Sequence, residues 1–378
     1  MSELNYLEKL LDGTEVEWKA LGDVTSVLRG KRLTKNLLSA EEKFPVFHGG
    51  LEPLGYYNKS NRPANTVMII NVGASAGTVG YSTVDFWSSD GCFCLEHNEL
   101  LNNRFLYFAL IGYQSLLKSK VRVAGIPTLD AIVVNKLLIP IPCPENPEKS
   151  LAIQSEIVRI LDKFTALTAE LTAELNMRKK QYNYYRDQLL SFKEGEVEWK
   201  TLGEVAVIGT GNHDTQDAIE HGKYIFYARG REPLKLNVFD FDETAIITAG
   251  DGAGVGKVFH YAKGKYALHQ RAYRIVPNAF MNPRFVYHYI TAYFFTYIQK
   301  ASVSSSVTSL RRPMFLKFPI PVPPSEEQAR IVEILDKFDT LTNSITEGLP
   351  REIELRQKQY EYYRDLLFSF PKPETVSN

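Results

Sequence analysis

Two stretches of the chain, residues 20–140 and 201–320, place basic and amide side chains among tyrosines and glycines. Arg and Lys neutralise phosphate groups, and Arg, Lys, Asn and Gln also match the hydrogen-bonding edges of bases, so this combination suits nucleic acid. In the first stretch the candidate contacts are Lys31, Arg32, Lys35, Tyr57, Asn58, Lys59, Arg62, Ser75, Lys120 and Arg122. In the second stretch they are Asn212, His213, Arg229, Arg231, Lys235, Lys257, His269, Gln270, Arg271, Arg311 and Arg312.

The charge of the chain is zero overall but unevenly distributed. Residues 20–140 hold 12 Lys and Arg against 9 Asp and Glu, and residues 196–320 hold 15 against 11. Two mildly basic stretches are compatible with an anionic partner at two places. A single basic side chain is more often an ordinary solvated charge, so the prediction applies to each set as a whole.

No catalytic motif accompanies these side chains. HExxH, GxSxG and paired Cys/His clusters are absent, and the seven histidines are scattered. AGDGAGVGK at 249–257 is not a phosphate-binding loop, because Asp251 and Val258 stand where GxxxxGK[ST] requires Gly and Ser or Thr. We interpret it as a glycine-dependent turn or as a loop lying close to a nucleic-acid groove. The sequence therefore predicts a chain that is not itself an enzyme and holds no metal.

A long internal repeat organises the chain. QYNYYRDQLLSF at 181–192 returns as QYEYYRDLLFSF at 359–370, with nine of twelve residues identical. LLDGTEVEWK at 10–19 also matches LLSFKEGEVEWK at 189–200, so the N-terminal segment resembles the stub of a third copy. Other repeated pairs are VEWKALGDV (16–24) with VEWKTLGEV (197–205), IVRILDKF (157–164) with IVEILDKF (331–338), and NNRFLYF (102–108) with NPRFVYH (282–288).

The repeated tails predict two long helices that pack on each other as a coiled coil. Apolar residues recur at alternating steps of four and three from 157 to 192, a pattern typical of a coiled-coil seam. In the second copy Gly348-Leu349-Pro350 predicts a break and restart, and Ser325-x-x-Gln328 predicts a capping box. The predicted seam consists of Ile157, Leu161, Phe164, Leu171, Leu175, Tyr182, Tyr185, Leu189, Ile331, Leu335, Phe338, Ile345, Tyr360, Tyr363 and Leu367. Two tyrosines off the seam, Tyr184 and Tyr362, are candidates for contact with a partner protein.

Between the helices, each divergent block alternates short β-like runs with turns and then adds one helical run. The fold class is therefore α+β, with two mixed α/β domains separated by two long helices and an internal pseudo-two-fold repeat. The predicted boundaries are a connector stub at 1–19, a first block at 20–143, a central helix at 144–195, a second block at 196–323, a C-terminal helix at 324–372 and a tail at 373–378.

The repeated segments resemble the specificity subunits of Type I restriction–modification systems over essentially the whole chain. The resemblance rests on ILDKF…RKKQYNYYRDQLLSF, ILDKF…RQKQYEYYRDLLFSF, GDGAGVGKVF with ALHQRAYRI, and the block endings IPIPCP and IPVPP. Tandem TAEL at 168–171 and 172–175 is similar to the spacer of one subgroup of the family. The resemblance implies two target-recognition domains and an antiparallel coiled coil.

The resemblance also implies a function and partners. Each recognition domain would read one half of a bipartite, asymmetric double-stranded DNA site, and the coiled coil would set the spacer between the halves. Two modification (methyltransferase) subunits would dock on the coiled coil, usually with two restriction (translocase and nuclease) subunits. S-adenosylmethionine, ATP and Mg²⁺ would belong to those partners, and this chain would hold no cofactor.

Two alternatives remain open. The chain could be the specificity subunit of a related two-subunit methylase and nuclease system, or a coiled-coil scaffold that binds only proteins. The divergent, mildly basic blocks favour DNA binding over the scaffold. No run of about 18 apolar residues predicts a membrane span, and the charged N-terminus lacks the apolar core of a signal peptide. With three unpaired cysteines as well, we expect a cytoplasmic protein.

Overall fold

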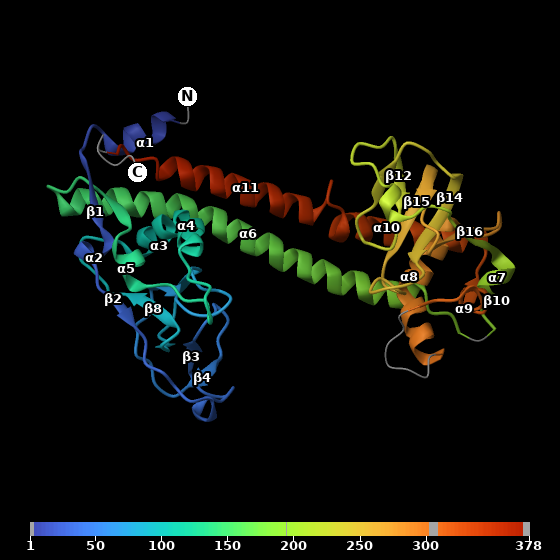
Figure 1. Ribbon diagram of the computed structural model, residues 1–378, viewed down its shortest axis with the longest axis horizontal. Helices are drawn as coiled ribbons and strands as arrows, with labels where there is room; N and C mark the ends of the chain where they lie inside the picture. The colour runs from blue at the N-terminus through green and yellow to red at the C-terminus, as the bar shows by residue number, and fades with distance from the viewer. Residues whose placement is uncertain (1–3, 194, 302–308, 373–378) are drawn as a thin grey trace. The chain divides into compact units, whose positions relative to one another are not determined.

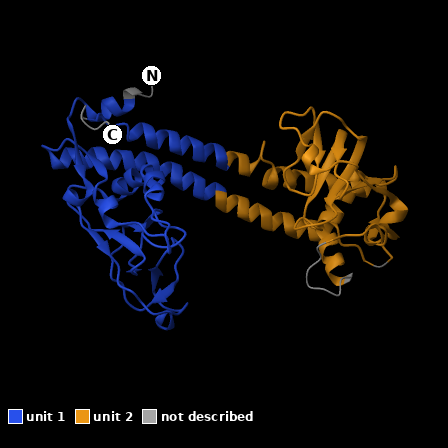
Figure 2. Ribbon diagram, viewed as in Figure 1, with its two compact units in different colours: residues 1–171, 353–378 blue, residues 172–352 orange. Residues whose placement is uncertain are grey.

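Each globular block folds together with parts of the long helices, which gives two units (Figure 1, Figure 2). The computed structural model describes residues 4–193, 195–301 and 309–372, so the predicted tail at 373–378 lies outside the described residues. Unit 1 comprises residues 1–171 and 353–378, and unit 2 comprises residues 172–352. The fold is mixed α/β, as the sequence predicts.

Unit 1 is built from three small sheets and a set of helices. Its strands pair in the orders β1-β9, β2-β8-β5-β6 and β4-β3-β7. Its strands are β1 (Val16–Ala20), β2 (Val27–Arg29), β3 (Phe44–Phe47), β4 (Gly55–Tyr57), β5 (Thr66–Ile70), β6 (Val79–Ser82), β7 (Trp87–Ser88), β8 (Cys92–Leu95) and β9 (Leu138–Pro142). Its short helices are α1 (Leu4–Leu11), α2 (Leu21–Val24), η1 (Lys35–Leu37), α3 (Asn103–Gly112), α4 (Gln114–Ser119) and α5 (Ala131–Asn135).

Unit 2 repeats this plan with longer strands. Its strands pair in the orders β10-β17 and β11-β16-β14-β15-β12-β13. Its strands are β10 (Glu198–Thr201), β11 (Ala206–Thr210), β12 (Tyr224–Tyr227), β13 (Leu234–Leu236), β14 (Phe241–Ala249), β15 (Phe259–Leu268), β16 (Ala272–Pro277) and β17 (Pro319–Val322). Its other helices are α7 (Leu202–Val205), η2 (Thr215–Asp217), α8 (Pro283–Ala301) and α9 (Arg312–Leu316).

The two blocks share one topology although their sequences diverge. In unit 1, β3 pairs in parallel with β7, and β5 pairs with both β6 and β8. In unit 2, β12 pairs in parallel with β15, and β14 pairs with both β15 and β16. The single strand β15 thus takes the place of β6 and β7 together. The correspondence of strands makes the loops that follow them equivalent as well.

The long helices carry both units. Helix α6 (Pro147–Leu189) is unbroken, whereas the second copy consists of α10 (Ser325–Asn343) and α11 (Leu349–Leu367). The predicted break is confirmed at Gly348, whose φ of +81° and close approach to the Thr340 carbonyl oxygen favour glycine. In unit 1 the first part of α6 runs antiparallel to α11, and in unit 2 its last part runs antiparallel to α10 (Figure 1).

Most of the predicted seam residues lie between helices or beneath a block. Ile345 does not: it is 79% exposed, because α10 ends at Asn343 and leaves it in the bend before α11. The prediction for Ile345 was therefore wrong. The fully or nearly buried members are Ile157, Leu161, Ile331, Leu335, Tyr360 and Leu367. The partly buried members are Phe164, Leu171, Leu175, Tyr182, Leu189, Phe338 and Tyr363, and Tyr185 is exposed.

A buried glutamine joins each block to its connector helix. In unit 1, Gln154 of α6 accepts a hydrogen bond from the Asn102 N–H at 2.8 Å and donates to the Leu100 carbonyl at 3.0 Å. In unit 2, Gln328 of α10 accepts from the Asn282 N–H at 2.7 Å and donates to the Pro323 carbonyl at 2.8 Å. Gln328 thus contacts backbone outside its own helix. The predicted capping box with Ser325 was wrong, since Pro324 occupies the N-cap without a side-chain bond.

An arginine on the helix of each block, Arg104 on α3 and Arg284 on α8, completes each joint. The Arg104 Nε donates to Asp162 at 2.8 Å, and the guanidinium lies over the rings of Tyr81 and Tyr107. In unit 2, Arg284 bonds two carboxylates, Asp336 and Asp339, each at 2.6 Å. Asn102 and Asn282 cap these helices by accepting from the N–H groups that follow. We call each set the block joint: Gln154, Asn102, Arg104 and Asp162 in unit 1, and Gln328, Asn282, Arg284, Asp336 and Asp339 in unit 2.

We expect the joint of unit 2 to weaken in acid through Asp336. Burial raises the pKa of this carboxyl, but hydrogen bonds from His288 and Arg284 outweigh it and hold the folded pKa below its ordinary value. Since the unfolded carboxyl binds its proton more readily, the stabilisation is full above about pH 4 and is lost as pH falls through the lower folded pKa. Asp336→Asn should cost about 1–2 kcal/mol of unfolding free energy at pH 6 and clearly less at pH 3 in urea unfolding. The same loss of unfolding free energy at both pH values would show that the ionised Asp336 carboxylate is not the cause of the stabilisation.

Candidate nucleic-acid interface

Four loops of unit 2 converge beside the ends of its central strands. The backbones of His213 and His269 form an isolated parallel β-bridge. The Gly250 N–H donates to the Arg271 carbonyl at 2.8 Å. Glycine permits the close approach, because a Cβ on Gly254 would lie 2.7 Å from the Arg229 carbonyl oxygen. The converging loops are residues 211–217, 228–232, 250–257 and 269–271.

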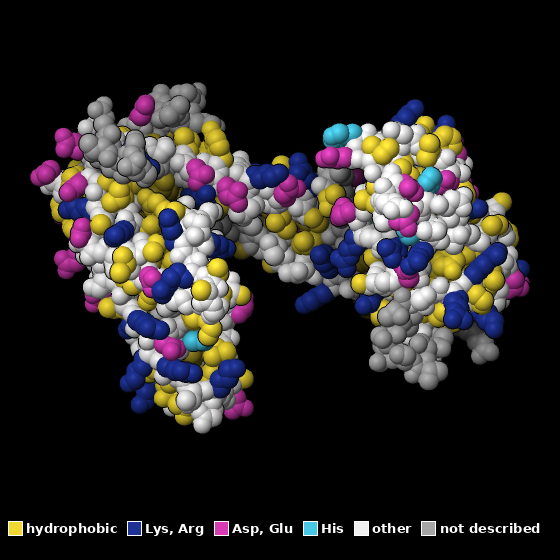
Figure 3. Space-filling model, viewed as in Figure 1, with side chains coloured by type: hydrophobic (Ala, Val, Ile, Leu, Met, Phe, Trp, Pro, Cys, Tyr) yellow, Lys and Arg dark blue, Asp and Glu magenta, His cyan; other side chains and the backbone are white. Residues whose placement is uncertain are grey.

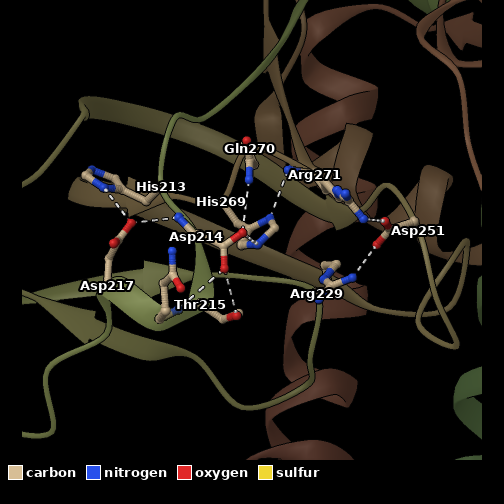
Figure 4. Close-up of polar contacts among 10 residues, drawn as sticks. His213, Asp214, Thr215, Asp217, Arg229, Asp251, His269, Gln270 and Arg271 are labelled. Carbon is tan, nitrogen blue, oxygen red and sulfur yellow. Dashed lines mark hydrogen bonds and ion pairs between the residues drawn. The ribbon is translucent and has the colours of Figure 1, made fainter.

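Two arginines share one carboxylate at the centre of these loops (Figure 4). The Arg229 Nη1 lies 3.0 Å from Asp251 Oδ1, and the Arg271 Nη1 lies 3.1 Å from Asp251 Oδ2. Burial raises the pKa of Asp251, but the two arginines outweigh it and leave the pKa below its ordinary value. The carboxylate therefore stays charged and holds both guanidinium groups in place, while the Arg271 side chain remains 64% exposed. We call these three residues the arginine fork.

Arg229 and Asp251 of the fork line an open cleft of about 640 Å³. Arg231 and Lys257 also line it, together with Thr215 and the glycine-rich turn. Lys257 lies over the Phe295 ring at 4.9 Å, which fixes the side chain near α8. Three cations (Arg229, Arg231 and Lys257) and two acids (Asp251 and Glu232) line the cleft, and this small excess of positive charge favours an anionic ligand.

A second polar group lies beside the fork. Gln270 donates to Asp214 at 3.0 Å, and the Nδ1 of the buried His269 accepts from the Arg271 N–H at 2.9 Å (Figure 4). Burial lowers the pKa of His269, and the charge of Arg229 lowers it further, so the ring is neutral with its proton on Nε2. His213 contacts Asp240 at 3.0 Å. The exposed Gln270 amide is thereby held next to the fork, where it can meet a base edge.

The remaining candidates of unit 2 lie outside the cleft. Arg311 is the N-cap of α9 and Arg312 its first residue. Both follow Leu310, whose N–H donates to the Gly250 carbonyl at 2.7 Å. They therefore flank the fork loop. Asn212 is exposed on the loop after β11, and Lys235 is exposed on β13.

Unit 1 brings together the equivalent loops with different side chains. The Gly73 N–H donates to the Pro127 carbonyl at 2.9 Å, and Arg122 pairs with Thr128, so the turn with Ser75 lies beside the loop with Lys120 and Arg122. The Arg122 guanidinium lies 3.0 Å from Asp130. At the position of the fork, His48 Nδ1 lies 3.2 Å from Asp90.

A second group in unit 1 surrounds Trp87. Its indole N–H donates to the Lys31 carbonyl at 2.7 Å, and Tyr57 packs edge-on against the indole ring at 5.3 Å. Arg62 pairs through its backbone with Phe86, the neighbour of Trp87. The other four candidates are exposed: Lys35 begins η1, and Arg32, Asn58 and Lys59 lie on the surrounding loops.

The sequence did not reveal the residues that contact and position these loop side chains. Asp251, Asp214, Asp90 and Trp87 are not among the predicted contacts, because that prediction rests on side chains that can bind a phosphate or a base edge directly. In the space-filling view, Lys and Arg are interspersed with acidic side chains on both blocks (Figure 3). An acid within contact distance of two arginines cannot be recognised without the loop geometry.

The described ranges contain no group of three or more His, Cys, Asp or Glu side chains arranged to hold a metal ion. Among the same residues, no helix is long and apolar enough to cross a membrane.

Comparisons with known proteins agree with this architecture. The model of the Type I restriction modification DNA specificity domain matches residues 14–178 and 194–355. The chain is 44% identical to the Type I restriction enzyme EcoR124I/EcoR124II specificity subunit of Escherichia coli, with 100% of each chain covered. It is 37% identical to the EcoprrI specificity subunit of the same species, over 92% of this chain and 93% of that one.

A solved structure has the same fold. The S subunit of the Type I restriction–modification system of M. genitalium superposes with a TM-score of 0.68 at 20% identity, over 96% of this chain and 98% of that one. The repeat, the two matched specificity domains and the similarity over the full length lead to one assignment. The chain belongs to the family of Type I restriction–modification specificity subunits.

Proposed function

We propose that this chain reads a bipartite, asymmetric double-stranded DNA site, with each block recognising one half. The observation that carries this proposal is the pair of equivalent loop clusters, which have one topology but different side chains. The Arg229, Asp251 and Arg271 fork of unit 2 has no arginine counterpart at His48 and Asp90 of unit 1. Two unlike readers on one scaffold suit two unlike half-sites.

The polar groups of the two clusters support direct readout. A guanidinium held in a fixed orientation can donate two hydrogen bonds to the O6 and N7 of guanine, and an amide can pair with adenine. Exposed cations such as Lys59, Arg231 and Arg312 suit the phosphates that flank the bases. Residues 20–143 and 196–323 would be the two recognition domains.

In this proposal, site recognition and catalysis belong to different subunits. This non-catalytic chain would select the site, and two methyltransferase subunits, usually with two restriction subunits, would carry the chemistry with S-adenosylmethionine, ATP and Mg²⁺. The coiled coil would set the spacer and dock the methyltransferases. We place the chain in the subgroup with TAEL repeats and in the cytoplasm, where its DNA and partners would be.

Sequencing the methylome of a host that expresses this chain with its cognate modification subunit would test the proposal. We expect methylation at a motif with two specific parts and a fixed gap, lost when this chain is omitted. Replacing residues 20–143 by the corresponding block of a relative should change only one half of the motif. A folded complex without chain-dependent methylation would contradict DNA recognition and favour the scaffold.

The length of α6 provides a separate prediction for the gap. Deleting Thr172–Leu175, one TAEL unit, shortens the helix by about 6 Å, which is under two base-pair rises. The preferred gap should therefore shorten by about 1–2 base pairs in the methylome. The variant Thr168→Ala/Thr172→Ala keeps the helix length and should keep the gap. A deletion variant that methylates at the original gap would refute the spacer role.

A further inference from the structure

Both loop clusters contain the same tight turn. In unit 2 it spans residues 269–272 and joins β15 to β16 (Figure 4), and in unit 1 it spans residues 89–92 and joins β7 to β8. Each turn is closed by a hydrogen bond from the N–H of its last residue to the carbonyl of its first, at 3.0 Å in unit 2 and 3.1 Å in unit 1. The central residues, in corresponding order, are Gln270 and Arg271 in unit 2 and Asp90 and Gly91 in unit 1.

Backbone hydrogen bonds also align the carboxylate of the arginine fork. In unit 2 the residue before Asp251 donates its N–H to the Arg271 carbonyl at 2.8 Å. In unit 1 the residue before Val72 donates its N–H to the Gly91 carbonyl at 3.2 Å. Val72 therefore stands where unit 2 has Asp251.

The other arginine of the fork is aligned in the same way. The N–H of the first turn residue donates to the Tyr227 carbonyl in unit 2 and to the Phe47 carbonyl in unit 1, at 3.0 Å in each case. Two residues further along the chain lie Arg229 in unit 2 and Gly49 in unit 1. Unit 1 thus has glycine, valine and glycine at the three positions of the fork.

Close packing keeps a fork out of unit 1. A Cβ on Gly91 would lie 2.7 Å from the Val72 Cγ1 and 2.9 Å from the Gly49 backbone nitrogen, so no larger side chain fits there without displacing its neighbours. A backbone without side chains also lets a ligand approach the turn closely. Asp90 is therefore the polar side chain at the centre of this turn.

The Asp90 carboxylate has one oxygen fixed and the other available. Its Oδ1 lies 3.2 Å from His48 Nδ1 and accepts from the Ser89 hydroxyl at 3.1 Å. In the part of the chain that the structure describes, no hydrogen bond or ion pair reaches Oδ2, and the side chain is 30% exposed. A carboxylate accepts hydrogen bonds and donates none, whereas a guanidinium donates and accepts none. The same turn thus presents an acceptor in unit 1, where Arg271 presents donors in unit 2.

We propose that Asp90 determines specificity in unit 1 by accepting, through Oδ2, a hydrogen bond from the exocyclic amino group of a base, N4 of cytosine or N6 of adenine. The inference rests on the proposed function and adds the class of base to it. Guanine and thymine present no amino group in the major groove, and their O6 and O4 are acceptors that a carboxylate repels. A carboxylate that gives up its hydration without meeting a donor also costs free energy, so a wrong base is penalised at this position.

The variant Asp90→Asn tests this assignment in the assembled methyltransferase complex. Asparagine before glycine suits the same turn, so the variant should keep the Tm of the unaltered chain. Its amide presents donors as well as an acceptor, so the preference for adenine or cytosine at one position of one half-site should fall about tenfold. Binding of duplexes with single base changes would measure this preference, once replacement of residues 20–143 has identified the half-site of unit 1.

Glu99→Gln is the matched control. It removes the same charge from an exposed turn before α3 and should leave every base preference unchanged. The assignment is wrong if Asp90→Asn alters no position, weakens binding to all sequences equally, or acts where the unaltered chain prefers guanine or thymine. If the unaltered complex bound no DNA, or showed no base preference in either half-site, the proposed function would fail instead.

Base analogues give a second measurement. Purine in place of adenine, or 2-pyrimidinone in place of cytosine, removes the amino group from which Oδ2 would accept. The unaltered complex should bind the analogue duplex about tenfold more weakly than the natural duplex, and the Asp90→Ala complex should bind the two duplexes about equally. Equal weakening in both complexes would show that another residue reads the amino group, which would overturn the role of Asp90.

Discussion

The variant Arg229→Ala/Arg271→Ala is expected to bind the cognate DNA at least about thirtyfold more weakly than the unaltered chain. Each well-placed bidentate arginine contributes about 1–3 kcal/mol of discrimination, and this variant removes both arms of the fork. The loss should fall on one half-site only, because unit 1 has its own loop cluster. Methylation of oligonucleotides with single base changes in each half would measure it. The control Lys337→Ala/Lys358→Ala removes the same charge from helix surfaces, where each lysine is paired at 2.8 or 2.6 Å with a glutamate of its own helix.

A variant of Asp251 can distinguish two roles of this residue: holding the two arginines in position, and lowering the positive charge of the cleft. Asp251→Asn removes a negative charge beside the cleft but leaves both arginines less firmly held. We expect non-specific DNA affinity to rise slightly while discrimination at that half-site falls about tenfold. Uniform tightening on all sequences, with discrimination intact, would show that Asp251 acts only through its charge.

The variant Arg284→Met should destabilise unit 2 by about 2–4 kcal/mol, the largest loss of folding stability that we predict. It leaves Asp336 and Asp339 without their common cation, and it removes the guanidinium from the rings of Tyr261 and Tyr287. Methionine keeps most of the side-chain volume, so the loss reports the charge and the hydrogen bonds. Urea unfolding followed by limited proteolysis would measure the loss and locate it in unit 2.

Arg104→Met in the joint of unit 1 is the matched comparison. Arg104 bonds one carboxylate, Asp162, which is 42% exposed, so its replacement should cost only about 1–2 kcal/mol. Equal losses in the two units would mean that the second carboxylate, Asp339, adds nothing to the joint.

The repeat in the sequence was sufficient to predict the fold class, the long helices and the break at Gly348. It also revealed NNRFLYF and NPRFVYH, but not that their Asn and Arg residues form the block joints, because the partner residues lie about 50 positions away along the chain. The pairing of β3 with β7 and the role of Asp251 depend on loops that meet only in three dimensions. Periodicity placed Ile345 in the seam, but the helix had already ended, since the pattern of apolar residues continues through a bend.

The block joints also affect how new recognition domains can be introduced. Gln154 and Gln328 bind backbone N–H and carbonyl groups, which every sequence provides. A foreign block needs only an Asn-x-Arg-Phe segment at the start of the helix equivalent to α3 or α8 and flanking strands that pair like β1 with β9. The connector helices therefore form a scaffold on which recognition domains can be exchanged. Libraries of chimaeras could be screened without redesigning these helices.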